Sequence, residues 1–255
     1  MSDLILVDEI EVGVTTITLN RPEKRNALNI LMLEALCDAI EDVSARKDQR
    51  ALAIRGAGPV FCAGLDLKEA GDPAISGRSA ALVRRMLESV YHCPCVTIAL
   101  IHGAALAGGA GLMAACDIAL ATKESKFGFP EVHRGLVAGL IMTFLRRQLH
   151  ERHARELLLL GEIIDAERAK EMGLINRTVS ADGLDEALGT IVVQVHKAPP
   201  GAIADTKAFF DQLWHHSLAD DLDGAHDVHV KMRTSEEAQE GMAAFLEKRK
   251  PQWMP

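Results

Sequence analysis

The alternation of apolar and polar residues predicts that the chain begins with a β-hairpin. The segment EVGVTTITLN at 11–20 alternates and is rich in Val, Ile and Thr, and a shorter apolar run at 4–8 precedes it. After the loop RPEKRNALN the period changes to that of a helix, with Asn29 as its N-cap and an end near Ala45. The apolar face of this helix consists of Ile30, Leu33, Leu36, Ile40 and Val43.

Strands and helices then alternate through the first half of the chain. Apolar runs predict strands at 51–58, 95–103 and 117–122, and a helical pattern covers about 79–91. Residues 71–78 contain Gly, Pro and Ser, and we expect them to be mobile. From about Gly139 the pattern is almost entirely helical, apart from a short strand at INRTV. This order predicts an α/β fold with a parallel sheet and helices outside it.

Composition is that of an ordinary globular protein. The chain has 255 residues, a hydrophobic fraction of 48% and a net charge of −8. The acidic balance gives no reason to expect nucleic-acid binding, and no apolar run is long enough to predict a membrane span. The N-terminal residues have the pattern of a folded segment and not that of a leader peptide. The five cysteines are odd in number and irregular in spacing. We therefore expect reduced thiols and a cytoplasmic location.

The cysteines and histidines do not form a convincing metal site. Cys93-Pro94-Cys95 lacks a second cysteine pair and is interpreted as small buried residues that lead into a strand. The pairs His150/His153 and His226/His229 have helical spacing but no Cys or carboxylate partner, so they are interpreted as surface histidines. We expect no metal.

The most informative stretch is AALAGGAGLMAACD, which begins at Ala104. The pattern Gly109-x-Gly111-x-x-Ala114 after a strand fits a dinucleotide-binding fingerprint, but that fingerprint normally belongs to the first βα unit of a fold. A nucleophile elbow would need a Ser or Cys at the turn, and none is present. The glycines could also be simple close-packed turns.

A third interpretation is that the glycines expose backbone N–H groups at a helix N-terminus. Such groups can stabilise a developing oxyanion without any reactive side chain. A second small-residue turn, Ala63-Gly64-Leu65, offers another N–H donor.

Six motifs in a fixed order identify the chain as similar to the crotonase, or enoyl-CoA hydratase/isomerase, superfamily. They are LNRPEKRNALN (19–29), FCAGLDLKE (61–69), IHGAALAGGAGLMAACDIALA (101–121), FGFPEVHRGL (127–136), ARELLLLGEIIDAERAKEMGLIN (154–176) and FLEKRKP (245–251). The resemblance implies a spiral of ββα turns over 1–195 that holds an acyl-CoA site. It also implies a helical C-terminal region, 196–255, that covers the site and builds a homotrimer or hexamer.

The resemblance also implies roles for individual residues. The N–H groups of Leu65 and Gly108 would form the oxyanion hole for a thioester, and Glu131 would be the acid/base. The positions that match CoA contacts are Lys24, Arg25, Ala27, Ala63, Asp66, Leu67 and Lys68. Substrate phosphates would account for Lys24, Arg25 and Lys68, and for the basic tail Lys248-Arg249-Lys250, whose alternative is a solvated helix end. The CoA is part of the substrate, and no separate cofactor is expected.

One expected carboxylate is missing. Hydratases of the family with two glutamates carry one of them early in the helix after the glycine turn, and the matching position here is Gly111. Hydration of a 2-enoyl-CoA through Glu131 alone is the first interpretation; double-bond isomerisation from position 3 to 2 and a non-catalytic acyl-CoA binder are the alternatives. Glu69, Asp72 and His133 are candidates for a second group. The acyl pocket is expected between 70–90 and 136–145.

Overall fold

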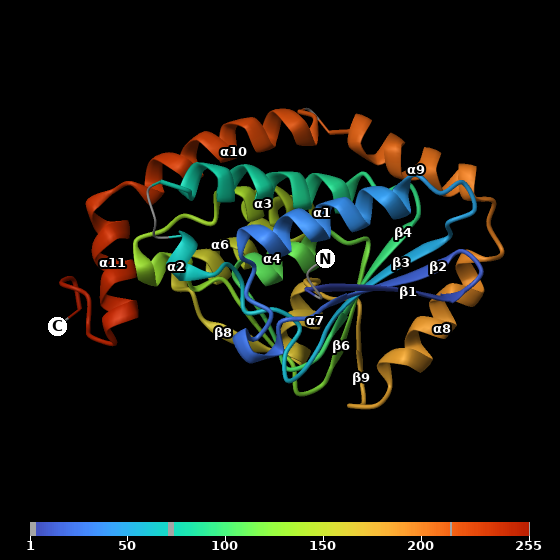
Figure 1. Cartoon of the computed structure of the whole chain (residues 1–255), viewed down its shortest axis with the longest axis horizontal. Helices are drawn as coiled ribbons and strands as arrows, with labels where there is room; N and C mark the ends of the chain where they lie inside the picture. Colours follow the sequence, from blue (N-terminus) through green and yellow to red (C-terminus); the bar gives the residue numbers. More distant parts are fainter. Residues whose placement is uncertain (1–3, 71–73, 215, 255) are drawn as a thin grey trace.

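In the part of the chain that the computed structural model describes, residues 4–70, 74–214 and 216–254, a six-stranded sheet lies at the centre (Figure 1). In spatial order its strands are β1 (Ile5–Glu11), β2 (Val14–Leu19), β3 (Ala51–Gly56), β4 (Val96–Ile101), β6 (Ile118–Thr122) and β9 (Arg177–Val179). Only β1 and β2 run antiparallel; the other neighbours are parallel. The predicted hairpin and parallel sheet are therefore confirmed, and INRTV contains the last strand.

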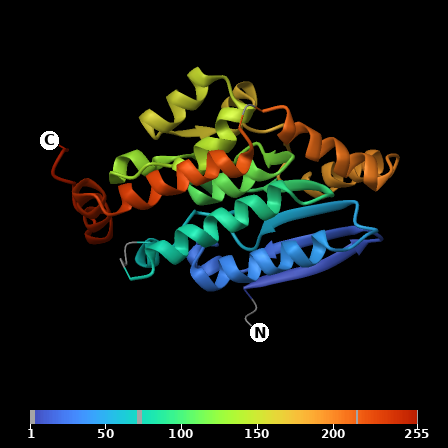
Figure 2. The same cartoon turned by 90° about the horizontal axis from the view of Figure 1, so that it is seen from above.

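Helices cover both faces of this sheet. On one side lie α1 (Ile30–Ser44) and α3 (Ser76–Tyr91), which run next to each other (Figure 2), and on the other lies α8 (Leu184–Val195). Successive side chains of β3 alternate between the two faces of the sheet. Leu52 and Ile54 belong to the core under α1 and α3, and Ala51 and Ala53 pack with α8.

The two predicted helices of the first half have the expected places. Asn29 caps α1, where its Oδ1 accepts a hydrogen bond from the Met32 N–H at 3.0 Å. Helix α3 begins at Ser76, three residues earlier than expected, so residues 76–78 are helical although we predicted mobility for 71–78. The remainder of that prediction includes residues 71–73, which lie outside the described residues.

A small second sheet corrects the sequence prediction. It consists of β5 (Ala104–Leu106), β7 (Lys126–Gly128) and β8 (Ile163–Asp165). We expected 126–128 in a loop and 163–165 in a helical stretch. Each strand has only three residues and forms by pairing with a distant segment, so no local period marks it. This sheet positions the segments on either side of α4 (Gly108–Ala115).

The remaining described helices follow the predicted pattern. They are α2 (Leu67–Ala70), α5 (Gly139–Gln148), α6 (Glu151–Leu160), α7 (Ala166–Met172), α9 (Pro200–Gln212), α10 (Leu218–Arg233) and α11 (Glu236–Glu247), with 3₁₀ turns η1 (Pro22–Lys24) and η2 (Pro130–Arg134). The division at 195/196 falls between α8 and α9 and stays a prediction. No helix of the described residues is both long and apolar enough to cross a bilayer.

The last helices are held onto the core by a buried arginine. Arg147 of α5 donates to Asp211 of α9 at 2.8 Å and to Asp221 of α10 at 3.1 Å. Helix α10 packs on both α3 and α5 (Figure 1).

Asn26 organises the loop between β2 and α1. Its side chain is fully buried, and its Nδ2 lies 2.9 Å from the carbonyl oxygens of Ala57 and Val60 and 3.1 Å from that of Phe61. Its Oδ1 accepts from the Arg21 N–H at 2.9 Å. One amide therefore joins the loop at 21–26 to the segment that follows β3.

We expect Asn26→Ala to lower the free energy of unfolding by about 3 kcal/mol, because it removes several buried hydrogen bonds at once. Asn29→Ala, which removes one capping bond, is the matched control and should cost about 1 kcal/mol. Urea unfolding midpoints measure both. Equal losses would contradict the organising role of Asn26.

Candidate active site

One cavity of about 600 Å³ collects the residues that the sequence singled out. Its wall includes Lys24, Arg25, Ala27, Ala63, Leu65, Asp66, Leu67, Lys68, Gly108 and Glu131. These come from η1 and the residues after it, from the turn before α2 and the start of α2, from the start of α4 and from η2. Residues of α5, α10 and the end of α11 complete the wall.

Two backbone turns meet at the centre of this cavity. Gly64 has a φ of +96°, and a Cβ added there would lie 2.9 Å from the Cβ of Ala107 and 3.2 Å from the Gly108 nitrogen. A Cβ on Gly108 would lie 3.6 Å from the Leu65 nitrogen. The N–H groups of Leu65 and Gly108 are therefore neighbours, and the approach depends on the missing side chain of Gly64.

Neither of these N–H groups donates to another protein group among the described residues. Gly108 is the first residue of α4, where N–H groups lack partners within the helix and the helix dipole is positive. Ala107 before it has φ +49° and ψ −124°, a conformation unusual for alanine. Its N–H donates to the Gly128 carbonyl at 2.9 Å, so the small sheet holds the strained residue in place.

Glu131 is a buried carboxylate in the same cavity. It lies in η2 directly after Pro130, and its Oε2 is buried and has no hydrogen-bond partner among the described residues. Burial raises the pKa of Glu131 to about 7, although the nearby Arg134 acts in the opposite direction. A carboxyl group with this pKa can both take and return a proton near neutral pH.

The candidates for a second acid/base have other partners. Glu69 Oε2 accepts from the Ile30 N–H at 2.7 Å, and the His133 Nε2 lies 2.7 Å from the Leu160 carbonyl oxygen. Neither residue lines the cavity, and Asp72 lies outside the described residues. Asp66 does line the cavity, but an ion pair joins it to Arg21 at 2.8 Å.

An apolar side chain fills the space beside Gly111. Gly111 is buried within α4 and does not line the cavity, and a Cβ added there would lie 2.8 Å from Cγ1 of Ile141. Ile141 itself lines the cavity. A longer side chain at position 111 would therefore have to displace Ile141.

The interpretation of His229 as a surface histidine is wrong. His229 lines the cavity, and its Nδ1 lies 3.4 Å from the Val137 carbonyl oxygen. Its Nε2 is buried without a partner in the described part of the chain. Arg233, one helical turn later, lines the same wall and was not anticipated; the only signal in the sequence is their spacing of four residues on one face of α10.

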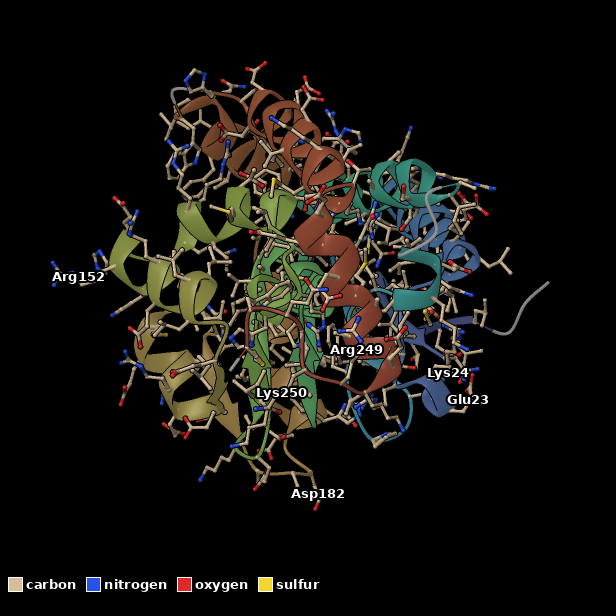
Figure 3. The ribbon with its side chains drawn as sticks, turned by 90° about the vertical axis from the view of Figure 1, so that its left-hand side faces the viewer. Glu23, Lys24, Arg152, Asp182, Arg249 and Lys250 are labelled. Carbon is tan, nitrogen blue, oxygen red and sulfur yellow. The ribbon has the colours of Figure 1, made fainter. Side chains whose placement is uncertain are left out.

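Exposed cations surround the mouth of the cavity, but the basic tail is not among the lining residues. Lys24, Arg25 and Lys68 are exposed and line the cavity. Arg249 instead forms ion pairs at 2.6 Å with both Glu240 and Glu247, on the side of the molecule that carries α11 (Figure 3). The solvated helix end is thus the better description of Arg249.

The cysteine pair belongs to the core. Cys93 and Cys95 are both buried there, with their Sγ atoms 3.4 Å apart, and all five cysteines are free. No cluster of three or more His, Cys, Asp or Glu side chains suited to a metal ion occurs in the described ranges.

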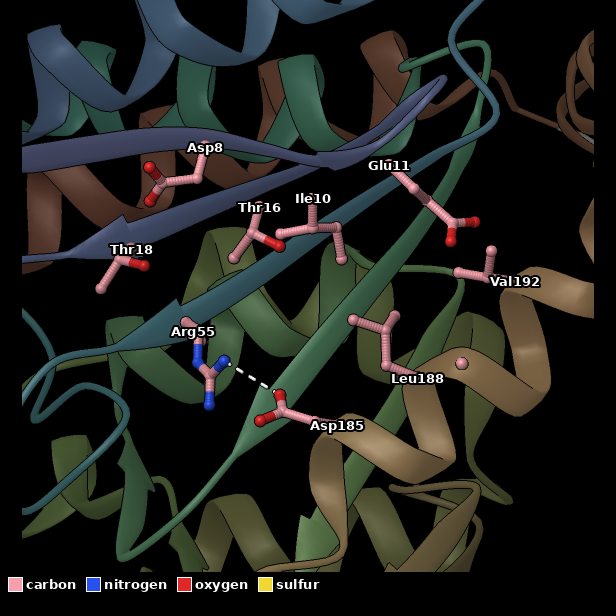
Figure 4. A pocket seen from close by; sticks show the side chains of 10 residues that line it. Asp8, Ile10, Glu11, Thr16, Thr18, Arg55, Asp185, Leu188 and Val192 are labelled. Atoms are coloured by element: carbon pink, nitrogen blue, oxygen red, sulfur yellow. Dashed lines mark hydrogen bonds and ion pairs between the residues drawn. The ribbon is translucent and has the colours of Figure 1, made fainter.

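A second hollow of about 400 Å³ lies between the β1–β2 hairpin and α8 (Figure 4). Its Arg55 and Asp185 form an ion pair at 3.0 Å across the hollow. None of the predicted site residues lines it. The first cavity is therefore the candidate active site.

Comparison with known proteins gives the family of the chain. The Enoyl-CoA hydratase/isomerase family matches residues 9–255. A Thermus thermophilus protein with a provisional enoyl-CoA hydratase name is 34% identical over 252 residues, which are 96% of this chain and 99% of that protein. A crystal structure of an enoyl-CoA hydratase from Mycobacterium avium is 31% identical, with a TM-score of 0.87 and complete coverage of both chains. One from Mycobacterium smegmatis is 34% identical, with a TM-score of 0.80 and 99% coverage of both. The chain therefore belongs to the enoyl-CoA hydratase/isomerase family of the crotonase superfamily and has that superfamily's mixed α/β fold with a helical C-terminal region.

Proposed function

We propose that this protein catalyses the reversible addition of water to a 2-enoyl-CoA thioester. The observation that carries the proposal is that one cavity holds a buried carboxylate oxygen and two backbone N–H groups, and that none of the three has a hydrogen-bond partner among the described residues. Family membership supports an acyl-CoA thioester as the substrate.

The backbone donors act on the thioester carbonyl. The Leu65 and Gly108 N–H groups donate to its oxygen, which becomes negative as the enolate forms. Since the donors are fixed before the reaction, they stabilise the transition state more than the ground state. Loss of one such donor costs roughly 100- to 1000-fold in rate in comparable sites.

Glu131 moves the proton. Its carboxylate takes a proton from water while the oxygen of that water bonds to the β carbon, and the double-bond electrons pass to the thioester oxygen. The protonated Glu131 then donates its proton to the α carbon as the carbonyl re-forms. Both new bonds form on one face, so a single carboxylate can complete the cycle.

Isomerisation of a 3-enoyl-CoA to a 2-enoyl-CoA is the second candidate. The observation that favours it is Ile141, which makes the wall beside Gly111 apolar instead of carboxylate-bearing. Glu131 would then shuttle a proton between the α and γ carbons without water. A non-catalytic acyl-CoA binder would have the same cavity and leave Glu131 unused.

Lys24, Arg25 and Lys68 suit the phosphates of CoA, because all three are exposed cations at the cavity. Ala27, Ala63, Asp66 and Leu67 would contact its nucleotide and pantetheine parts. No cofactor beyond the CoA of the substrate enters this proposal. The five free cysteines fit a reducing compartment, and we expect the protein to act in the cytoplasm.

Incubation of 2-enoyl-CoA and 3-enoyl-CoA thioesters with the protein in D₂O tests the reaction. Hydration adds one water and leaves one deuterium on the α carbon after transfer to H₂O, which mass spectrometry detects. Double-bond movement without water gain would identify the isomerase instead. Neither change, with CoA-thioester binding retained, would favour the binder.

Glu131→Gln should lower turnover by at least about 100-fold, because it removes the proton carrier. Glu69→Gln is the matched control, since it makes the same chemical change at a carboxylate outside the cavity. Steady-state kinetics on the active thioester measures both. Full turnover by Glu131→Gln would show that the mechanism is wrong.

The raised pKa of Glu131 predicts two pH effects. In the wild type, kcat/KM should rise about tenfold per pH unit up to about pH 7 and then level off, as the carboxylate ionises. The folded protein binds this proton more tightly than the unfolded chain, where the ordinary value is 4.5. Wild-type stability should therefore fall relative to Glu131→Gln between pH 4.5 and about 7. If the melting temperatures of the wild type and of Glu131→Gln changed in parallel across that pH range, the raised pKa of Glu131 would be contradicted.

We also propose a homotrimer or hexamer, which an apolar surface at the end of α9 and the residue after it supports. Phe209, Phe210 and Leu213 are 57%, 62% and 65% exposed in the single chain. Light scattering should give a trimer or hexamer, and Phe210→Asp should lower the mass. Val193→Asp, at an exposed valine of α8, is the control. A monomeric wild type would overturn this assembly.

A further inference from the structure

A buried arginine that forms no ion pair with any described carboxylate lies in the wall of the active-site cavity. Arg233, the last residue of α10, is only 5% exposed. Its Nη1 donates to the Ser76 carbonyl at 3.1 Å, and no carboxylate of the described residues lies within salt-bridge distance. Burial lowers the pKa of Arg233 to about 10, so it remains charged at neutral pH. No described carboxylate thus compensates this charge beside the cavity.

Arg147 shows the arrangement that a buried arginine of this fold can have when carboxylates are near. Arg147, with a side chain 6% exposed, has two carboxylates at 2.8 and 3.1 Å. Arg134, in the same cavity, interacts with the charge of Glu131. A buried charge without a counterion is costly, and an anionic ligand would remove that cost. None of the four aspartates of α10 forms an ion pair with Arg233 in the described part of the chain. Asp221 pairs with Arg147, Asp223 pairs with Arg84, and Asp220 accepts from the Ser217 hydroxyl.

The position of Arg233 points to the acyl end of the substrate. Arg233 contacts Ser76 at the start of α3. His229, which lies one helical turn before Arg233 in α10, contacts Val137. These contacts fall within the two segments expected to form the acyl pocket. Apolar side chains of the same segments line the cavity, and they include Val83, Leu140 and Ile141. Arg233 and His229 are therefore polar groups beside the apolar side chains of this recess.

His229 does not supply a second positive charge. Burial and the charge of Arg233 lower the pKa of His229 to about 4, so the ring is neutral near pH 7. Its Nδ1 faces the Val137 carbonyl oxygen, which leaves Nε2 as an acceptor. The charged donor of this recess is Arg233.

CoA phosphates have better-placed partners. Lys24 at the end of η1, Arg25 directly after it and Lys68 of α2 are exposed, and they suit groups that stay in contact with water. Arg233 is buried and belongs to α10, so it suits a small anion that enters the cavity with the acyl chain. A guanidinium binds a carboxylate through two parallel hydrogen bonds.

We propose that the acyl group of the substrate carries a carboxylate at the end remote from the thioester, and that Arg233 pairs with it. This inference rests on the proposed function, since it assigns the substrate class of the same site. Recognition of this kind excludes acyl chains that end in a methyl group, because they leave the buried charge unpaired.

Two series of 2-enoyl-CoA thioesters of matched chain length, one ending in methyl and the other in carboxylate, test the proposal on the wild-type protein. We expect kcat/KM to favour the carboxylate series by about 30-fold or more at the best length. Calorimetry with the saturated thioesters should show the same preference in Kd. Equal or better use of the methyl series would overturn the proposal and leave the proposed function intact.

Arg233→Met provides the second measurement, and Lys231→Met, at an exposed lysine of the same helix, is its control. Arg233→Met should abolish the preference by raising KM for the carboxylate series, whereas Lys231→Met should retain it. An equal loss for both series and for free CoA would assign Arg233 to a phosphate and overturn the proposal. If neither series nor CoA binds, the proposed function fails and this proposal with it. The wild-type comparison decides the question even if Arg233→Met does not fold.

Discussion

The site depends on the close approach of two backbone turns. Gly64 lies against Ala107 and Gly108 at a distance that a side chain would prevent, and this contact sets the Leu65 and Gly108 N–H groups side by side. The strain at Ala107 is held by a bond to Gly128 in the small sheet. Donors fixed in this way need no rearrangement when charge develops on a bound thioester, which is the physical basis of the proposed catalysis.

The rest of the fold supplies the supports for this contact. Parallel strands of the large sheet bring the segments that follow β3 and β4 to the same edge, and Asn26 joins the loop after β2 to them. Helix α10, fixed through Arg147, closes the cavity from the other side. The cavity is thus built from segments separated by some two hundred residues, and its burial is what raises the pKa of Glu131.

The chemistry of the cavity is asymmetric. One wall offers Glu131, and the wall beside Gly111 offers Ile141 in place of a carboxylate. Proton transfer must therefore pass through a single acid/base in the proposed reaction. The polar groups of α10, His229 and Arg233, lie in the recess expected for the acyl chain, where a charge selects substrates and does not move the reacting proton.

The sequence by itself determined the hairpin, the α/β order, the Asn29 cap and the motif residues that now surround one cavity, because local periodicity and short motifs record these features. It did not determine β7 and β8, whose three-residue strands exist only through pairing with β5 or with each other. It also missed His229 and Arg233, since their spacing on α10 is equally typical of a solvated helix face. Only the packing of α10 on α3 and α5 decided that this face is buried. Burial lowers the pKa values of His229 and Arg233 and raises that of Glu131.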